Sequence, residues 1–116
     1  MDKDFIWTDD VDCAITVCDK EGKVLFQNKV SRGLFQRDGE TMVGKSLMPC
    51  HSDHSRGLIG EMLATGNTHS YTITKKGRKK LVYQTSWKPY GEVAGLVEIS
   101  FYLPETMVHY DRDKGE

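Results

Sequence analysis

The sequence predicts an α+β domain: one five-stranded antiparallel sheet with its helices packed on a single face. The 116 residues are the length of one domain with one hydrophobic core. Five segments show the period-2 alternation of apolar residues that is typical of strands. Short turns join these segments, except after the second, where segments with helical spacing intervene. Such an order favours antiparallel pairing with the helices on one side.

The first half of the chain begins with a strand hairpin. Residues 12–18 alternate Cys13, Ile15 and Val17 against smaller residues, and residues 23–27 continue as a second strand after a turn over residues 19–22. Asn28 can cap a short helix, because its side chain accepts hydrogen bonds from unpaired amides of the first turn. We expect this helix to end at residues 37–39 and to present one apolar face made of Val30, Leu34 and Phe35.

A longer helix is predicted in the second half of residues 44–66. Ser52 or Asp53 can cap its start, and Gly66 follows its last apolar residue, where a left-handed conformation costs least for glycine. The spacing of four apolar residues places them on one stripe of the helix, as expected for packing on a sheet. These residues are Leu58, Ile59, Met62 and Leu63.

The C-terminal third is predicted to consist of strands over residues 69–74, 81–88 and 93–103. Residues 75–80 form a strongly basic turn, which could contact phosphate or could simply be a solvated hairpin tip. Pro104 ends the last strand. We therefore divide the chain into an N-terminal segment (1–10), a domain (11–103) and a polar tail (104–116).

Composition excludes several classes of function. The formal charge of −1 argues against a nucleic-acid-binding protein that works through overall attraction. No apolar run approaches the roughly 20 residues of a membrane span. The acidic start lacks the basic and apolar regions of a secretory signal, so we expect a cytoplasmic protein with no membrane contact. In that compartment the three cysteines are expected to be reduced thiols.

The order of elements resembles the PAS domain family over most of residues 11–103. The matching positions include Asp19 and Gly22 in the first turn, Asn28, Phe35, the Gly44-Lys45-Ser46 step, Gly66, and Gly95 before the last strand. The resemblance implies a sensory or interaction module whose sheet and helices enclose a pocket for a small ligand or cofactor. It also implies a homodimer, and a separate signalling protein as the output partner because this chain carries no effector domain.

The resemblance bears on the choice of cofactor. Light-sensing members carry a flavin-reactive cysteine at the position occupied here by Leu47, so flavin is not expected. Haem-bearing oxygen sensors of the family share Leu-Met-Pro before the helix and Ala-Thr-Gly after it, as at residues 47–49 and 64–66. Their axial histidine corresponds to Ser55, one residue, or about 100° of helix, from His54. Haem therefore stays open as an alternative cofactor.

Cys50, His51 and His54 form a cluster just before and within the start of the longer helix. We expect them to border the pocket mouth and to assist an anionic ligand, because a helix start offers free amides and a positive dipole. Zinc binding with His69, iron ligation, a thiol nucleophile with a histidine base, and plain packing are the alternatives. Since no orienting third group or oxyanion site is identifiable, no enzyme activity is expected.

The pocket wall is predicted from the alternation in the last two strands and from the helix stripe. The candidates are Tyr83, Thr85, Trp87, Val97, Ile99 and Phe101 from the strands and Leu58 and Met62 from the helix. Thr85 would either bind ligand or face solvent. If these residues only pack together, the domain would be a ligand-free dimerisation and interaction module.

Large apolar residues also precede the first strand. Phe5, Ile6 and Trp7 are not needed for the first hairpin and are costly to expose. We therefore expect a homodimer formed through this segment and the outer face of the sheet.

Overall fold

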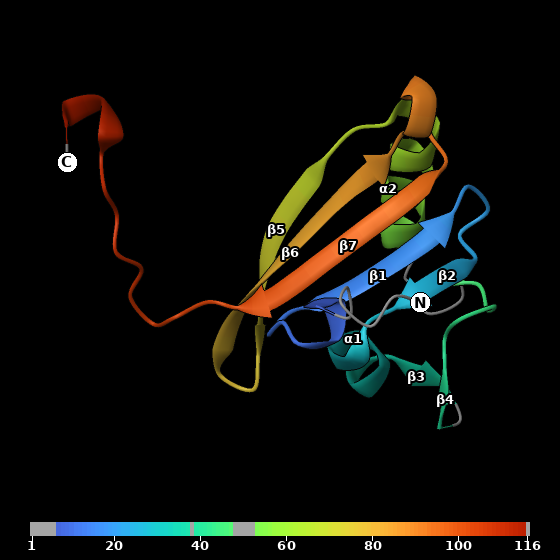
Figure 1. Ribbon diagram of the computed structural model, residues 1–116, viewed down its shortest axis with the longest axis horizontal. Helices are drawn as coiled ribbons and strands as arrows, with labels where there is room; N and C mark the ends of the chain where they lie inside the picture. The colour runs from blue at the N-terminus through green and yellow to red at the C-terminus, as the bar shows by residue number, and fades with distance from the viewer. Residues whose placement is uncertain (1–6, 38, 48–52, 116) are drawn as a thin grey trace.

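The computed structural model describes residues 7–37, 39–47 and 53–115, with backbone alone for residues 37 and 53–56. Five antiparallel strands form one sheet in the order β2-β1-β7-β6-β5 (Figure 1). The strands are β1 (Ala14–Asp19), β2 (Val24–Gln27), β5 (His69–Lys75), β6 (Arg78–Trp87) and β7 (Gly95–Tyr102). The fold class predicted from the sequence is confirmed, with the first and last strands of the sheet paired side by side.

The first hairpin and the helix after it are fixed by two polar side chains. Asp19 Oδ1 accepts from the backbone amides of Glu21 and Lys23, each at 2.9 Å, and holds the β1–β2 turn. Asn28 caps α1 (Lys29–Leu34), because its Oδ1 accepts from the Ser31 amide at 3.0 Å. The expected apolar face of this helix is wrong: Ser31 is its buried residue, and Leu34 is 42% exposed.

Two short strands that the sequence did not predict follow α1. β3 (Gln36–Arg37) and β4 (Glu40–Thr41) pair with each other as a separate two-stranded sheet. The chain then returns along β2, where the Val24 amide donates to the Lys45 carbonyl at 2.9 Å and the Gly44 amide donates to the Val24 carbonyl at 2.8 Å. These hydrogen bonds hold residues 44–47 alongside β2 at the edge of the sheet.

The longer helix, α2 (Asp53–Thr65), has the predicted bounds and apolar stripe. Ile59 and Met62 are buried against Cys18 and Leu96 in the hydrophobic core. Gly66 ends the helix with a φ of 78°, and its amide donates to the Met62 carbonyl at 2.8 Å. Neither α1 nor α2 is long and apolar enough to cross a membrane.

The turn between β5 and β6 is shorter than predicted. Lys76 and Gly77 alone make the turn, with φ values of 52° and 74°, the left-handed pair that suits a two-residue hairpin. Lys75 already pairs with Arg78. Arg78, Lys79 and Lys80 therefore belong to β6, where alternate side chains face the helices. Beyond β7, the chain extends away from the sheet and carries η4 (Arg112–Lys114) near its end (Figure 1).

The strand register defines which residues face the helices. Thr16 on β1 lies on the inner face, because its Oγ1 is 2.6 Å from Ser31 Oγ on α1. Cys18 and Leu96 lie on the same face and contact α2. Continuing the pairing assigns Lys80, Val82, Gln84, Glu98 and Ser100 to this inner face. Their neighbours in sequence form the outer face.

Candidate functional site

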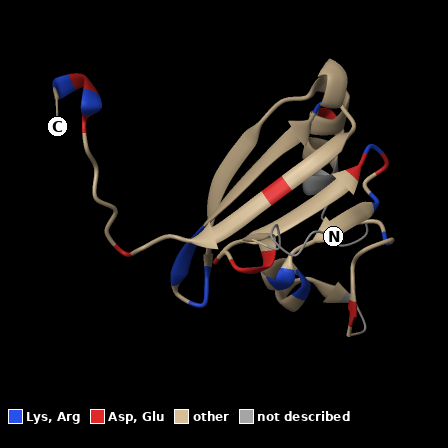
Figure 2. Ribbon diagram, viewed as in Figure 1, with Lys and Arg blue, Asp and Glu red and all other residues tan. Residues whose placement is uncertain are grey.

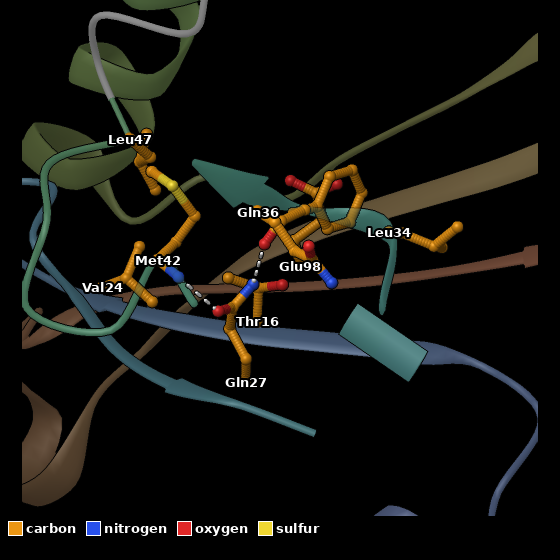
Figure 3. A pocket seen from close by; sticks show the side chains of 9 residues that line it. Thr16, Val24, Gln27, Leu34, Gln36, Met42, Leu47 and Glu98 are labelled. Carbon is orange, nitrogen blue, oxygen red and sulfur yellow. Dashed lines mark hydrogen bonds between the residues drawn. The ribbon is translucent and has the colours of Figure 1, made fainter. Parts of the chain in front are cut away.

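A cavity of about 270 Å³ lies between the inner face of the sheet, the end of α1, Gln36 on β3 and residues 42–47 (Figure 3). Its wall is mostly apolar and takes residues from β1, β2, α1, β3, β7 and the loop after β4. The lining residues are Thr16, Val24, Gln27, Leu34, Phe35, Gln36, Met42, Leu47 and Glu98. A mostly apolar wall with a few polar groups is typical of small-molecule sites.

Gln27 holds this wall together. Its Nε2 donates to Ser31 Oγ at 3.0 Å and to the Phe35 carbonyl at 3.1 Å, and its Oε1 accepts from the Met42 amide at 2.8 Å. The amide group is thus engaged at both ends, as a buried amide must be if its desolvation is to be offset. Gln27 therefore positions the cavity wall and has little capacity left for a ligand.

Glu98 gives the cavity its charge. Among the described residues that line the cavity, it alone has an ionisable side chain. Gln84 Nε2 donates to its Oε2 at 3.3 Å, and no cation of the described residues pairs with it. Its negative field extends along the inner face: after burial, Glu98 contributes to raising the pKa of Tyr71. Burial, with smaller contributions from Asp19 and Glu98, also raises the pKa of Cys18 to about 11.

The sequence matches the family described as PAS fold over residues 8–101. The chain belongs to the PAS family. A search of the curated proteins finds no match to the sequence.

Solved structures agree with this PAS assignment at the level of the fold. A sensory box sensor histidine kinase from Vibrio cholerae aligns with a TM-score of 0.65 and 16% identity, over 84% of this chain and 87% of that chain. The Aer2 receptor from Vibrio cholerae, described as a dual PAS-heme oxygen sensor, has a TM-score of 0.60 and 16% identity, over 79% and 95%. The VqmA dimer from Vibrio cholerae aligns with a TM-score of 0.68 and 11% identity, over 90% of this chain and 52% of that chain.

The described wall of the 270 Å³ cavity of this PAS domain offers haem iron one possible axial ligand. An axial ligand for haem iron comes from histidine, cysteine, methionine or tyrosine. Met42 is the one such residue in the described wall, and the Glu98 carboxylate lines the same space.

The predicted wall residues of the strands lie on the other face of the sheet. Tyr83, Thr85, Trp87, Val97, Ile99 and Phe101 alternate with the inner-face residues, so the expectation that they face the helices is wrong. Thr85 Oγ1 is 2.7 Å from Thr68 Oγ1, and Trp87 Nε1 donates to the Cys18 carbonyl at 3.1 Å. Phe101 additionally borders a second cavity, at the end of β7. The sequence alone does not show which row of a strand faces the helices, because the residues of both rows recur with the same period of two.

The helix residues predicted for the wall border a different hollow. Leu58 and Met62 line a cavity of about 200 Å³ together with His69. His69 Nδ1 is buried there without a hydrogen-bond partner in the described part of the chain. The described residues contain no group of three metal-binding side chains. Cys50 and His51 lie outside the described residues, and of His54 the structure describes only the backbone, in α2.

Sequence reasoning missed the residues that give the cavity its chemistry. Glu98 interrupts the apolar run Leu96-Val97-Glu98-Ile99, and a charge inside a central strand is a signal that could have been used. Gln27 and Met42 carried no such signal, because their roles depend on a contact across 15 positions of the chain.

Proposed function

We propose that this PAS domain is a sensory module that binds a small ligand in the Glu98 cavity and relays its occupancy to a separate signalling protein. The observation that carries the proposal is a carboxylate without a described cationic partner in a mostly apolar cavity. Two structural neighbours, a sensor histidine kinase and an oxygen sensor, support a sensory role.

The ligand is a small organic cation or another strong hydrogen-bond donor with an apolar body. A donor that reaches Glu98 would form a charge-assisted hydrogen bond, roughly twice as strong as a neutral one. Val24, Met42 and Leu47 would contact the apolar part of such a ligand (Figure 3). Ligand binding would also compensate the cost of holding a carboxylate beside apolar side chains.

The proposed relay runs through β7. Glu98 lies between Val97 and Ile99, whose side chains lie on the outer face. Glu98 and these outer-face residues share one strand, so a displacement of the β7 backbone on ligand binding would move both faces together. We place the homodimer contact on this apolar outer face, where the Tyr83 and Phe101 side chains are partly exposed.

The N-terminal segment gives a second connection between cavity and dimer. Asn28 Nδ2 donates to the Thr8 carbonyl at 2.7 Å, and Asp9 accepts from the Lys29 amide at 2.8 Å. The segment is therefore anchored at the start of α1, the helix that borders the cavity. Trp7, which is 57% exposed, is available for a partner copy. Phe5 and Ile6 lie outside the described residues.

The proposal assigns no catalytic role and places the protein in the cytoplasm. The Cys18 thiol is buried, and its pKa of about 11 keeps it protonated, which makes it a poor nucleophile. A ligand-free interaction module is the second candidate function. It is favoured by the same apolar outer face, which could bind a partner whether or not the cavity is filled.

A thermal-shift screen of small amines, carboxylic acids and neutral metabolites tests the proposal. We expect amines to raise the melting temperature, and Glu98→Gln to remove the effect. Glu92→Gln is the matched control, because Glu92 is exposed and does not line the cavity. The proposal fails if no amine stabilises the wild type, or if amines stabilise Glu98→Gln equally well.

A further inference from the structure

A second cavity, of about 200 Å³, lies at the far end of the inner face. It is bounded by α1 through Val30 and Leu34, by the first residues of β6 and by the last residues of β7. A run of basic residues covers this end, over the β5–β6 turn and the start of β6 (Figure 2). The cavity is separate from the Glu98 cavity, with Leu34 on the wall of both.

Lys80 lines this cavity in an unusual state for a lysine. It is only 4% exposed, although lysine is almost never buried without a partner. Its Nζ lies 5.7 Å from the centre of the Phe35 ring and 5.4 Å from that of Tyr102. No carboxylate of the described residues forms an ion pair with it. The rings attract the charge but are not strong hydrogen-bond acceptors for the N–H groups of Nζ, and no carboxylate in the described part of the chain takes that place.

Ser100 lines the same cavity from the neighbouring strand. It is 2% exposed, and its Oγ is buried with no hydrogen-bond partner in the described part of the chain. Ser100 pairs with Val82, and Tyr102 pairs with Lys80. Ser100 and Lys80 therefore lie on the same face of the sheet, as diagonal neighbours across the β6–β7 pair. The Ser100 hydroxyl has no described hydrogen-bond partner, and the Lys80 ammonium in the same cavity has no described counter-charge. Together they indicate a missing acceptor.

The remaining charges at the cavity favour an anion. Arg78 also lines it, with Cζ 4.2 Å from the centre of the Tyr102 ring. Asp12 is the opposing charge, and its side chain is exposed at the rim. Two cations against one exposed carboxylate leave the site positive.

We propose that this cavity binds a small oxyanion, a phosphate or carboxylate group that accepts hydrogen bonds from Lys80 Nζ and Ser100 Oγ. The anion would supply the counter-charge that Lys80 lacks and the acceptor that Ser100 lacks. Arg78 adds attraction from the open side. The site goes beyond the ligand cavity proposed above and does not depend on it, because no residue but Leu34 is common to the two walls.

An NMR titration with inorganic phosphate, and separately with acetate, tests this site. Ionic strength is kept constant with sodium chloride, and the amides of Lys80 and Ser100 are followed. We expect saturable shifts with at least one of the two anions, and the tighter one identifies the oxyanion class. The absence of saturable shifts with both anions would overturn the proposal.

Matched variants make the test specific. Lys80→Met should weaken binding by about tenfold or more, the factor that corresponds to about 1.4 kcal/mol. Lys79→Met removes the same charge from the outer face, next to Lys80 in sequence, and should change affinity less than about twofold, because surface charges are screened. Ser100→Ala is the second variant and should weaken binding even if Lys80→Met does not fold. Equal effects of the two lysine variants, or unchanged affinity in Ser100→Ala, would show that the site is wrong.

Discussion

Replacing Asn28 with alanine should destabilise the domain more than any other single polar substitution near the cavity. Asn28 is fully buried. Its Oδ1 accepts from the amides of Ile15 and Ser31 at 2.9 and 3.0 Å. Its Nδ2 donates to the carbonyls of Thr8 and Cys13 at 2.7 and 2.9 Å. One side chain thus connects the N-terminal segment, the residue before β1, β1 itself and α1.

The magnitude follows from these four contacts. Loss of a helix N-cap costs about 0.5–2 kcal/mol, and each further buried group left unpaired costs about 1–3 kcal/mol. Thr8, Cys13 and Ile15 are only half-buried, so water can restore part of the loss. We expect the free energy of unfolding to fall by about 3–5 kcal/mol, a large share of the roughly 5–15 kcal/mol typical of a domain.

Urea denaturation followed by circular dichroism measures this change. Asn67→Ala is the matched control, because Asn67 is exposed and should change stability by less than about 0.5 kcal/mol. Asn28→Asp keeps the accepting oxygens but loses both donors, so it should also destabilise. A loss below about 1 kcal/mol in Asn28→Ala would refute the reasoning, because the loss of a helix N-cap together with three partly buried hydrogen bonds should cost more than that.

Three further predictions follow from the packing, titration and surface of the sheet. A side chain at Gly95 would collide with the Cys18 carbonyl and with Trp87 Nε1, so Gly95→Ala should destabilise the domain by about 3 kcal/mol or more. Gly60 lies in open space on α2, so Gly60→Ala should stabilise the domain by about 0.5–1 kcal/mol. Equal effects of the two substitutions in thermal unfolding would contradict this prediction. Burial raises the pKa of Cys18 from 9.0 in the unfolded chain to about 11 in the folded protein. The stability that the protonated thiol contributes is therefore complete below pH 9 and is lost as the pH rises toward 11. Denaturation at each pH should show the wild type losing up to about 3 kcal/mol relative to Cys18→Ala across this window, and a constant difference would count against the shift. Ile99→Lys on the outer face, or deletion of residues 1–8, should convert a dimer to a monomer in light scattering; an unchanged mass would exclude the outer-face dimer.

The helices and hairpins were predictable because each has a local signal. Asn28 caps α1 through its own side chain, and Gly66 ends α2 in the left-handed conformation expected of glycine. The two-residue strands β3 and β4 were not predictable, since four residues are too few to show a period. The basic run at residues 75–80 was assigned to a turn on charge alone, which concealed the inward position of Lys80.

The face of the sheet could not be assigned from the sequence, because the inner row of this sheet mixes polar with apolar residues. Half-buried sheets normally place apolar residues inside and polar residues outside. Here the inner row of β6 and β7 includes Gln84 and Glu98, and the outer row includes Val97 and Ile99. Alternation identifies two faces but does not say which one meets the helices. The polar residues in the inner row are informative, since polar groups under the helices suit a ligand, and the apolar groups on the outer face suit a partner.

The most direct test of the ligand cavity is a methyl NMR titration with two probes of equal length and opposite charge. Butylammonium should shift the methyl signals of Val24, Met42 and Leu47 in a saturable way, whereas butyrate should not reach them beside Glu98. Glu98→Gln should abolish the butylammonium shifts. Shifts confined to Val97 and Ile99, or equal responses to both probes, would contradict the account, because they would place binding on the outer face or show that Glu98 does not select the ligand.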